Sequence, residues 1–128
     1  MLAVGEHVWG EVDDRTRRIS SALAGGLGCS HQEVCGALSG GVLIVGGLFG
    51  RTSSDQDDSH CNQLACTYRG RFLQEFGASR CGDLRASGYG SDGIWPCATL
   101  VERATLILLE VLAERQGYTT AGLASASE

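Results

Sequence analysis

Six cysteines are the residues best able to do chemistry in this chain of 128 amino acids. Such a number in a short chain indicates either the disulfide framework of a secreted protein or a metal or redox site in a reducing compartment. The spacing selects no particular metal, because the chain has no Cys-x-x-Cys pair, no zinc-finger spacing and no ferredoxin-type run. The positions are Cys29, Cys35, Cys61, Cys66, Cys81 and Cys97.

Cys35, Cys81 and Cys97 have similar local contexts. Cys35 and Cys81 are each followed by a glycine, Gly36 and Gly82, which would let the backbone approach a cofactor or a second sulfur closely. We expect Cys35 and Cys97 to lie near helix N-termini, where backbone N–H groups favour a thiolate. If these segments converge, they could bind an iron–sulfur cluster or form a reactive dithiol.

The other thiols and the histidines are weaker candidates. Cys29 and His31 precede Cys35 closely, so either could complete a metal site as a fourth ligand. Cys61 and Cys66 are five residues apart, about 140° around a helix, and cannot readily pair with each other. We interpret both as small apolar residues of a helix.

The first half of the chain predicts two helices. Apolar residues recur at helical spacing from Leu2 to Leu23, which predicts one amphipathic helix. Ser30 and Glu33 match a capping box, which would place Cys35 in the second turn of the next helix. That helix should end at Gly46, Gly47 or Gly50.

The second half predicts two longer helices joined by an irregular segment. A stripe of Leu64, Tyr68, Phe72 and Phe76 predicts a helix over residues 59–76. Residues 78–96 contain many glycines, with a single helical turn at 81–84, and the last helix should span 97–116. The fold class is therefore all-α, a small bundle of about four helices with a long Cys/Gly-containing loop before the last one.

Length and composition restrict the alternatives. The chain has the size of one domain, which we place at residues 1–116, followed by a frayed tail at 117–128. The net charge of −5 and the lack of a basic cluster argue against nucleic acid as a partner. No apolar run is long enough for membrane insertion and no signal peptide is visible, so we expect a cytoplasmic protein.

The order of these segments resembles the family of redox-active proteins named for the cysteine pattern C_GCAxxG_C_C. The resemblance runs from about Ser21 to Leu112. It implies a small helical redox protein in which Cys35, Cys81 and Cys97 match family cysteines. This chain departs from the pattern in reading Cys-Gly-Ala and in having no cysteine before Cys29. The segments that carry it are Gly25-Gly26, Val34 to Gly41, Gly47 to Gly50, Phe72 to Gly77, Cys81 to Leu84, and Cys97 with Leu100-Val101-Glu102.

Three hypotheses follow from the sequence. The first is an electron carrier or oxidoreductase with an iron–sulfur cluster on Cys35, Cys81 and Cys97, completed by Cys29 or His31. The second is a thiol–disulfide protein that uses the same three cysteines. The third is a structural or partner-binding helical domain. The first two imply an electron-transfer or thiol partner protein, and helix faces of small residues favour a homodimer.

Overall fold

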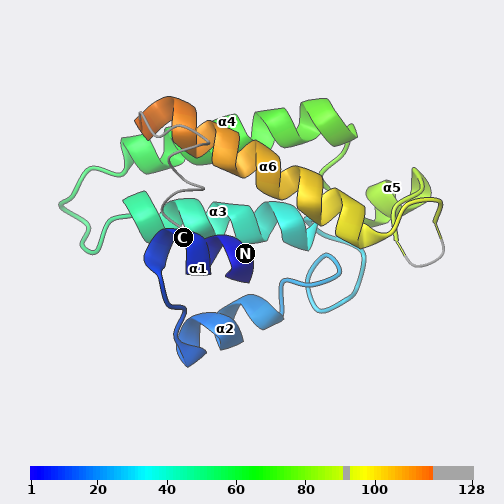
Figure 1. Cartoon of the computed structure of the whole chain (residues 1–128), viewed down its shortest axis with the longest axis horizontal. Coiled ribbons are helices and arrows are strands. Elements are labelled where there is room, and N and C mark those ends of the chain that lie inside the picture. The colour runs from blue at the N-terminus through cyan, green and yellow to red at the C-terminus, as the bar shows by residue number, and fades with distance from the viewer. Residues whose placement is uncertain (91–92, 117–128) are drawn as a thin grey trace.

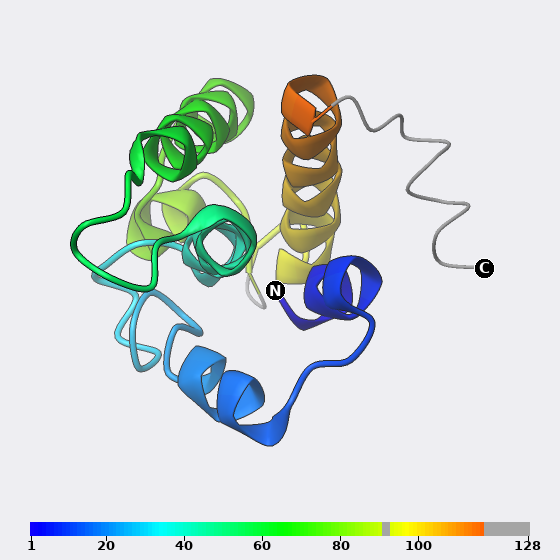
Figure 2. The same ribbon diagram turned by 90° about the vertical axis from the view of Figure 1, so that its left-hand side faces the viewer.

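Three long helices form the centre of the molecule. The computed structural model describes residues 1–90 and 93–116, and in that part every regular element is a helix. The long helices are α3 (Gly36–Phe49), α4 (Ser59–Phe76) and α6 (Cys97–Gln116), which pack against one another. Figure 2 shows them as a triangle, with the short helices α1 (Leu2–Trp9) and α2 (Asp14–Ser21) outside it. The all-α prediction is confirmed.

The helix count differs from the prediction of about four. The described residues form six helices. One of the additional helices is α5 (Cys81–Ala86), which lies in the segment before α6 (Figure 1). The predicted ranges 59–76 and 97–116 agree with α4 and α6, and α3 ends before Gly50, one of the predicted stops. The expected tail at 117–128 lies outside the described residues, and the single-domain boundary stays a prediction.

The single amphipathic helix expected from Leu2 to Leu23 is wrong. Gly10 ends α1 with a φ of 86°, in the left-handed region that favours glycine. The Asp13 carboxylate then starts α2 by accepting a hydrogen bond from the backbone N–H of Thr16 at 2.8 Å. Because the chain turns between these residues, Ile19 does not join a continuous apolar stripe and is 61% exposed.

The predicted capping box is also wrong. Ser30 and Glu33 lie in an irregular segment, and α3 begins only at Gly36 with Cys35 as its N-cap. The Ser30 hydroxyl instead donates to the carbonyl of Gly26 at 2.8 Å, which closes the turn before the helix. Cys35 is therefore at the very start of α3 rather than in its second turn.

The apolar core lies between the three long helices. The predicted stripe on α4 is confirmed, because Leu64, Tyr68, Phe72 and Phe76 are all buried. The Tyr68 hydroxyl lies 3.4 Å from the carbonyl of Ala37 on α3 and 3.3 Å from that of Ala104 on α6. Tyr68 thus connects all three long helices at the middle of the core.

The face of α6 that packs on the core is apolar, and Ile107 is partly buried against it. Leu100, Ala104, Leu108 and Val111 are buried in the core. Val101 is 45% exposed, and it lies at the edge of the pocket described below.

Candidate functional site

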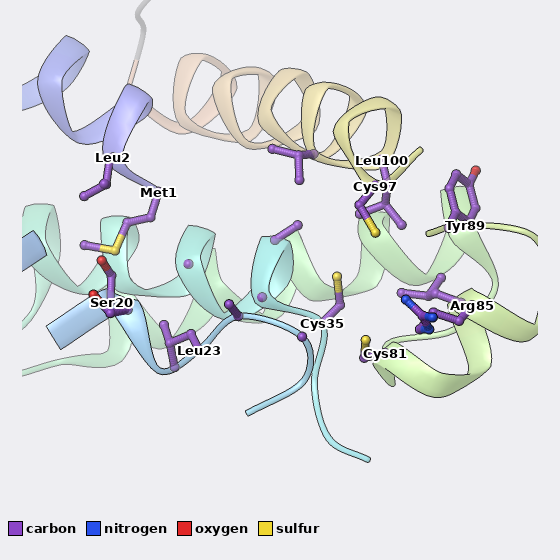
Figure 3. Close-up of a pocket in the computed structure, with 18 of the residues that line it drawn as sticks. Met1, Leu2, Ser20, Leu23, Cys35, Cys81, Arg85, Tyr89, Cys97 and Leu100 are labelled. Carbon is purple, nitrogen blue, oxygen red and sulfur yellow. The ribbon is translucent and has the colours of Figure 1, made fainter. Parts of the chain in front are cut away.

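Three cysteines from separate parts of the chain line one pocket. Cys35 begins α3, Cys81 begins α5 and Cys97 begins α6, and all three open into a pocket of about 450 Å³. Figure 3 shows their side chains gathered toward one end of this pocket, near Arg85 and Tyr89. The three segments thus meet at one pocket, as the sequence hypotheses require, whereas the chemical role of the thiols stays a prediction.

A short backbone pairing positions Cys35 beside Cys81. The Cys35 N–H donates to the carbonyl of Ser79 at 2.8 Å, and the Cys81 N–H donates to that of Glu33 at 2.8 Å. These bonds flank an isolated antiparallel bridge between Val34 and Arg80. Side chains alternate along extended backbone, so Cys35 and Cys81 lie on the same side of this bridge.

The turn formed by residues 25–31 packs against the start of α5, next to the thiols. Cys29 is exposed and lies in a segment where Gly25, Gly26, Leu27, Gly28, Cys29 and His31 all have positive φ. A methyl group placed on Gly26 would come within 2.6 Å of the Cβ of Cys81. Glycine is therefore needed at Gly26 for this turn to pack against the start of α5.

Burial is the main influence on the two inner thiols. It raises the pKa of Cys35, and negative charge on Cys81 or Cys97 would raise that pKa further. The backbone N–H groups of Ala37 and Leu38 act in the opposite direction, although they make no capping hydrogen bond to the side chain. Cys35 is therefore protonated at neutral pH.

Cys81 interacts with every other thiol near the pocket. Burial raises its pKa, the cationic side chain of Arg85 lowers it, and negative charge on Cys97 or Cys29 raises it. The charge of Cys81 in turn acts on Cys35. Cys81 is thus the central member of a group that also contains Cys29, Cys35 and Cys97.

Gly36 and Gly82, the predicted cofactor-binding glycines, contact other parts of the backbone. A methyl group on Gly36 would lie 3.0 Å from the carbonyl oxygen of Leu23, and one on Gly82 would lie 2.7 Å from that of His31. Both glycines let the backbone of residues 23–31 approach the starts of α3 and α5. This packing explains their identity, and their role toward a cofactor stays a prediction.

The sequence analysis missed Arg85 and Tyr89, which line the pocket beside the thiols. Arg85 follows Cys81 by four residues, so the two side chains share a face of α5. Extending the expected helical turn at 81–84 by one residue would have placed Arg85 beside Cys81. Tyr89 could not be placed, because its position depends on ring contacts with Phe76 and Trp95.

Cys61 and Cys66 lie on α4, outside this pocket. Cys61 is partly buried against the core, as expected for a small apolar residue. Cys66 is exposed and lines a separate apolar groove between α3 and α4. Cys66 is therefore a suitable reference thiol for experiments on the pocket.

Comparison with known proteins identifies the family. A family model described as "Putative redox-active protein (C_GCAxxG_C_C)" matches residues 1–111. The chain belongs to this family. No curated protein and no solved structure matches it. No helix in the described part of the chain is long and apolar enough to cross a membrane.

The side chains, as placed, do not form a metal site. In residues 1–90 and 93–116, no three residues of the His, Cys, Asp and Glu types are arranged to hold a metal ion. Thiolates are the soft ligands that iron and zinc sites use, and because burial raises the pKa of Cys35 and of Cys81, binding of a metal there would have to displace their protons.

Proposed function

We propose that this redox-active protein works by thiol–disulfide exchange at Cys97 and Cys81. The observation that supports the proposal is the opening of three thiols, from three separate helix starts, into one pocket. A dithiol needs only two sulfurs to meet, whereas a metal site needs three or four ligands in a fixed geometry. A disulfide therefore requires a less exact arrangement of these side chains than a metal site does.

Cys97 is the attacking thiol and Cys81 the resolving thiol. Cys97 is exposed at the first residue of a 20-residue helix, where a partner disulfide can reach its sulfur. Cys81 is less exposed, but Arg85 favours its thiolate. Burial raises the pKa of Cys35, and among the described residues no cation offsets that effect as Arg85 does at Cys81.

The exchange conserves atoms and electrons. The Cys97 thiolate attacks one sulfur of a partner disulfide, the partner's S–S bond breaks, and the first partner thiolate leaves and takes up a proton. Cys81 then attacks the Cys97 sulfur of the mixed disulfide and displaces the second partner thiolate. The two cysteines lose two electrons and two protons, which the partner disulfide gains, and the reverse reaction restores both thiols.

Trapping the mixed disulfide tests these roles. With hydroxyethyl disulfide as the oxidant, Cys81→Ser should accumulate a mixed disulfide on Cys97, and Cys97→Ser should lose most of the rapid reaction. Cys66→Ser, which removes an exposed thiol of α4, should react like the native chain. Mass spectrometry of the intact chain distinguishes these products. Equal, slow reaction of all six cysteines in the native chain would contradict the proposal.

An iron–sulfur cluster on Cys29, Cys35, Cys81 and Cys97 is the second candidate. The observation in its favour is that ionisation of Cys81 is coupled to each of the other three thiols. Since the described residues do not form a metal-binding group, we derive no step through a cluster. Protein purified without oxygen would show visible absorption bands and bound iron if this candidate were correct.

A further inference from the structure

The pocket extends well beyond the three thiols. Figure 3 shows Cys35, Cys81 and Cys97 toward one end, while Leu23, Met1 and Leu2 lie progressively further away. The remaining lining includes aliphatic residues such as Ala24, Leu100 and Val101, together with the polar residues Arg17, Ser20 and Ser21. A thiol–disulfide reaction at the sulfurs requires none of this additional apolar surface.

From this juxtaposition of a dithiol and an apolar slot, we propose that the pocket binds an alkyl-substituted quinone as the oxidant of the Cys81–Cys97 pair. The inference rests on the proposed thiol–disulfide function and adds the electron acceptor. The quinone ring lies at the thiols, and its alkyl substituent lies along Leu23 and Ala24. Electrons then pass from a thiol partner, through the dithiol, to the quinone.

The size and the lining of the slot favour this class over other two-electron acceptors. A volume of about 450 Å³ lies within the range of small-molecule sites, about 300–1,000 Å³. Glutathione disulfide carries four carboxylates and two ammonium groups, and the two arginines of the lining, Arg17 and Arg85, cannot pair with all of them, so burying the rest against aliphatic side chains is unfavourable. A flat quinone ring with an alkyl substituent has an almost wholly apolar surface and two carbonyl oxygens.

Arg85 supplies the polar group that a quinone needs. It lines the thiol end of the slot, where its guanidinium can stabilise negative charge developing on a quinone oxygen. Its charge also favours the Cys81 thiolate. Arg17, the other cation of the lining, forms an ion pair with Glu6, so Arg85 beside the thiols is the cation that orients the ring toward the sulfurs.

The reaction balances with a quinone as acceptor. The Cys97 thiolate adds to a ring carbon and forms a C–S bond. Cys81 attacks the Cys97 sulfur, so that the S–S bond forms as the C–S bond breaks and the electron pair returns to the ring. The two thiols lose two protons and two electrons in total, and the quinone takes up both to become the hydroquinone.

The test uses the reduced full-length chain and decylubiquinone, whose fully substituted ring prevents lasting arylation of thiols. We expect saturable formation of hydroquinone under anaerobic conditions, with one Cys81–Cys97 disulfide formed per quinone consumed. Val101→Asp places a charge at the edge of the slot and should raise the apparent KM roughly tenfold or more. Leu106→Asp is the matched control, because Leu106 is equally accessible on α6 but does not line the slot.

Hydroxyethyl disulfide separates failure of this inference from failure of the proposed function. If the chain forms the Cys81–Cys97 disulfide with hydroxyethyl disulfide but not with the quinone, the quinone proposal is overturned and the dithiol function stands. Equal quinone kinetics in Val101→Asp and Leu106→Asp would also overturn it. If neither oxidant forms the disulfide, the proposed function itself fails.

Discussion

At the residue scale, the three thiols of the site differ in burial, in exposure and in neighbouring charge. Burial raises the pKa of Cys35 and of Cys81, whereas Cys97 is exposed at a helix start. Arg85 partly offsets the effect of burial at Cys81, and no cation does so at Cys35. These environments give the thiols an order of reactivity that their sequence contexts, each at a segment start, did not predict.

Alkylation rates should follow this order. With iodoacetamide at neutral pH, we expect Cys97 to react first, Cys81 more slowly and Cys35 last, because only the accessible thiolate is nucleophilic. The rates at Cys81 and Cys35 should keep rising at a pH where an ordinary thiol has levelled off. Peptide mass spectrometry over a pH series measures this, with Cys66 as the exposed reference. A Cys35 that reacts as fast as Cys97 would contradict the assignment.

Stability should fall in alkaline solution for the same reason. A thiol whose pKa is raised by folding stays protonated in the native state while the unfolded chain ionises, so stability is lost above about pH 8.5, the ordinary value for cysteine. Cys35→Ala should reduce this slope at the cost of some packing. Urea unfolding at pH 7 and at pH 9.5 gives the comparison, and an unchanged slope would show that Cys35 does not ionise on unfolding in this range.

At the element scale, the close packing of α3 explains its composition. A methyl group on Gly41 would lie 2.5 Å from the ring of Tyr68, and one on Gly47 would lie 2.2 Å from Trp9. Glycine is unfavourable in a helix interior, so this helix depends on its neighbours rather than on intrinsic propensity. The small residues that looked suited to a ligand or a partner helix pack against α4 and α1 of the same chain.

Gly41→Ala and Gly46→Ala should therefore have opposite effects. Gly41→Ala forces Tyr68 from its place between the long helices and should destabilise the fold by about 1–3 kcal/mol. Gly46 has open space around it in the same helix, so Gly46→Ala should stabilise by up to about 1 kcal/mol. Thermal or urea unfolding measures both, and a neutral Gly41→Ala would show that Tyr68 has room to move.

Elements fixed by local signals could be predicted from the sequence, and those that depend on tertiary contacts could not. Helix α4 was predicted because its apolar stripe and Gly77 are local features. The break between α1 and α2 has local signals in Gly10 and Asp13, but the helical spacing of apolar residues from Leu2 to Leu23 runs across it and predicts one helix. The left-handed turn around Cys29 could not be predicted, since it needs a positive φ at the non-glycine residues Leu27, Cys29 and His31.

At the scale of the whole molecule, the three long helices pack together, and the thiol site lies at one end of them. The core connects α3, α4 and α6 through Tyr68, and an ion pair between Arg71 and Glu114 further joins α4 to α6. Cys35 and Cys97 begin two of these helices, while Cys81 begins the short α5. Cys35 also packs against the core, so the site is continuous with the packing of the long helices.

Oxidation should stabilise the molecule. A Cys81–Cys97 disulfide closes a loop of about 15 residues, which restricts the unfolded chain and contributes about 3 kcal/mol if the bond forms without strain. Urea unfolding of the oxidised and reduced protein should differ by about that amount, and the difference should vanish in Cys97→Ser. A less stable oxidised form would mean that the disulfide distorts the helix starts.

The measurement that tests the central claim most directly is disulfide mapping of the native chain after limited oxidation with hydroxyethyl disulfide. The account predicts one dominant cross-linked peptide pair that joins Cys81 to Cys97, with Cys61 and Cys66 still free. Cross-links scattered over all six cysteines, or none involving the pocket thiols, would contradict it.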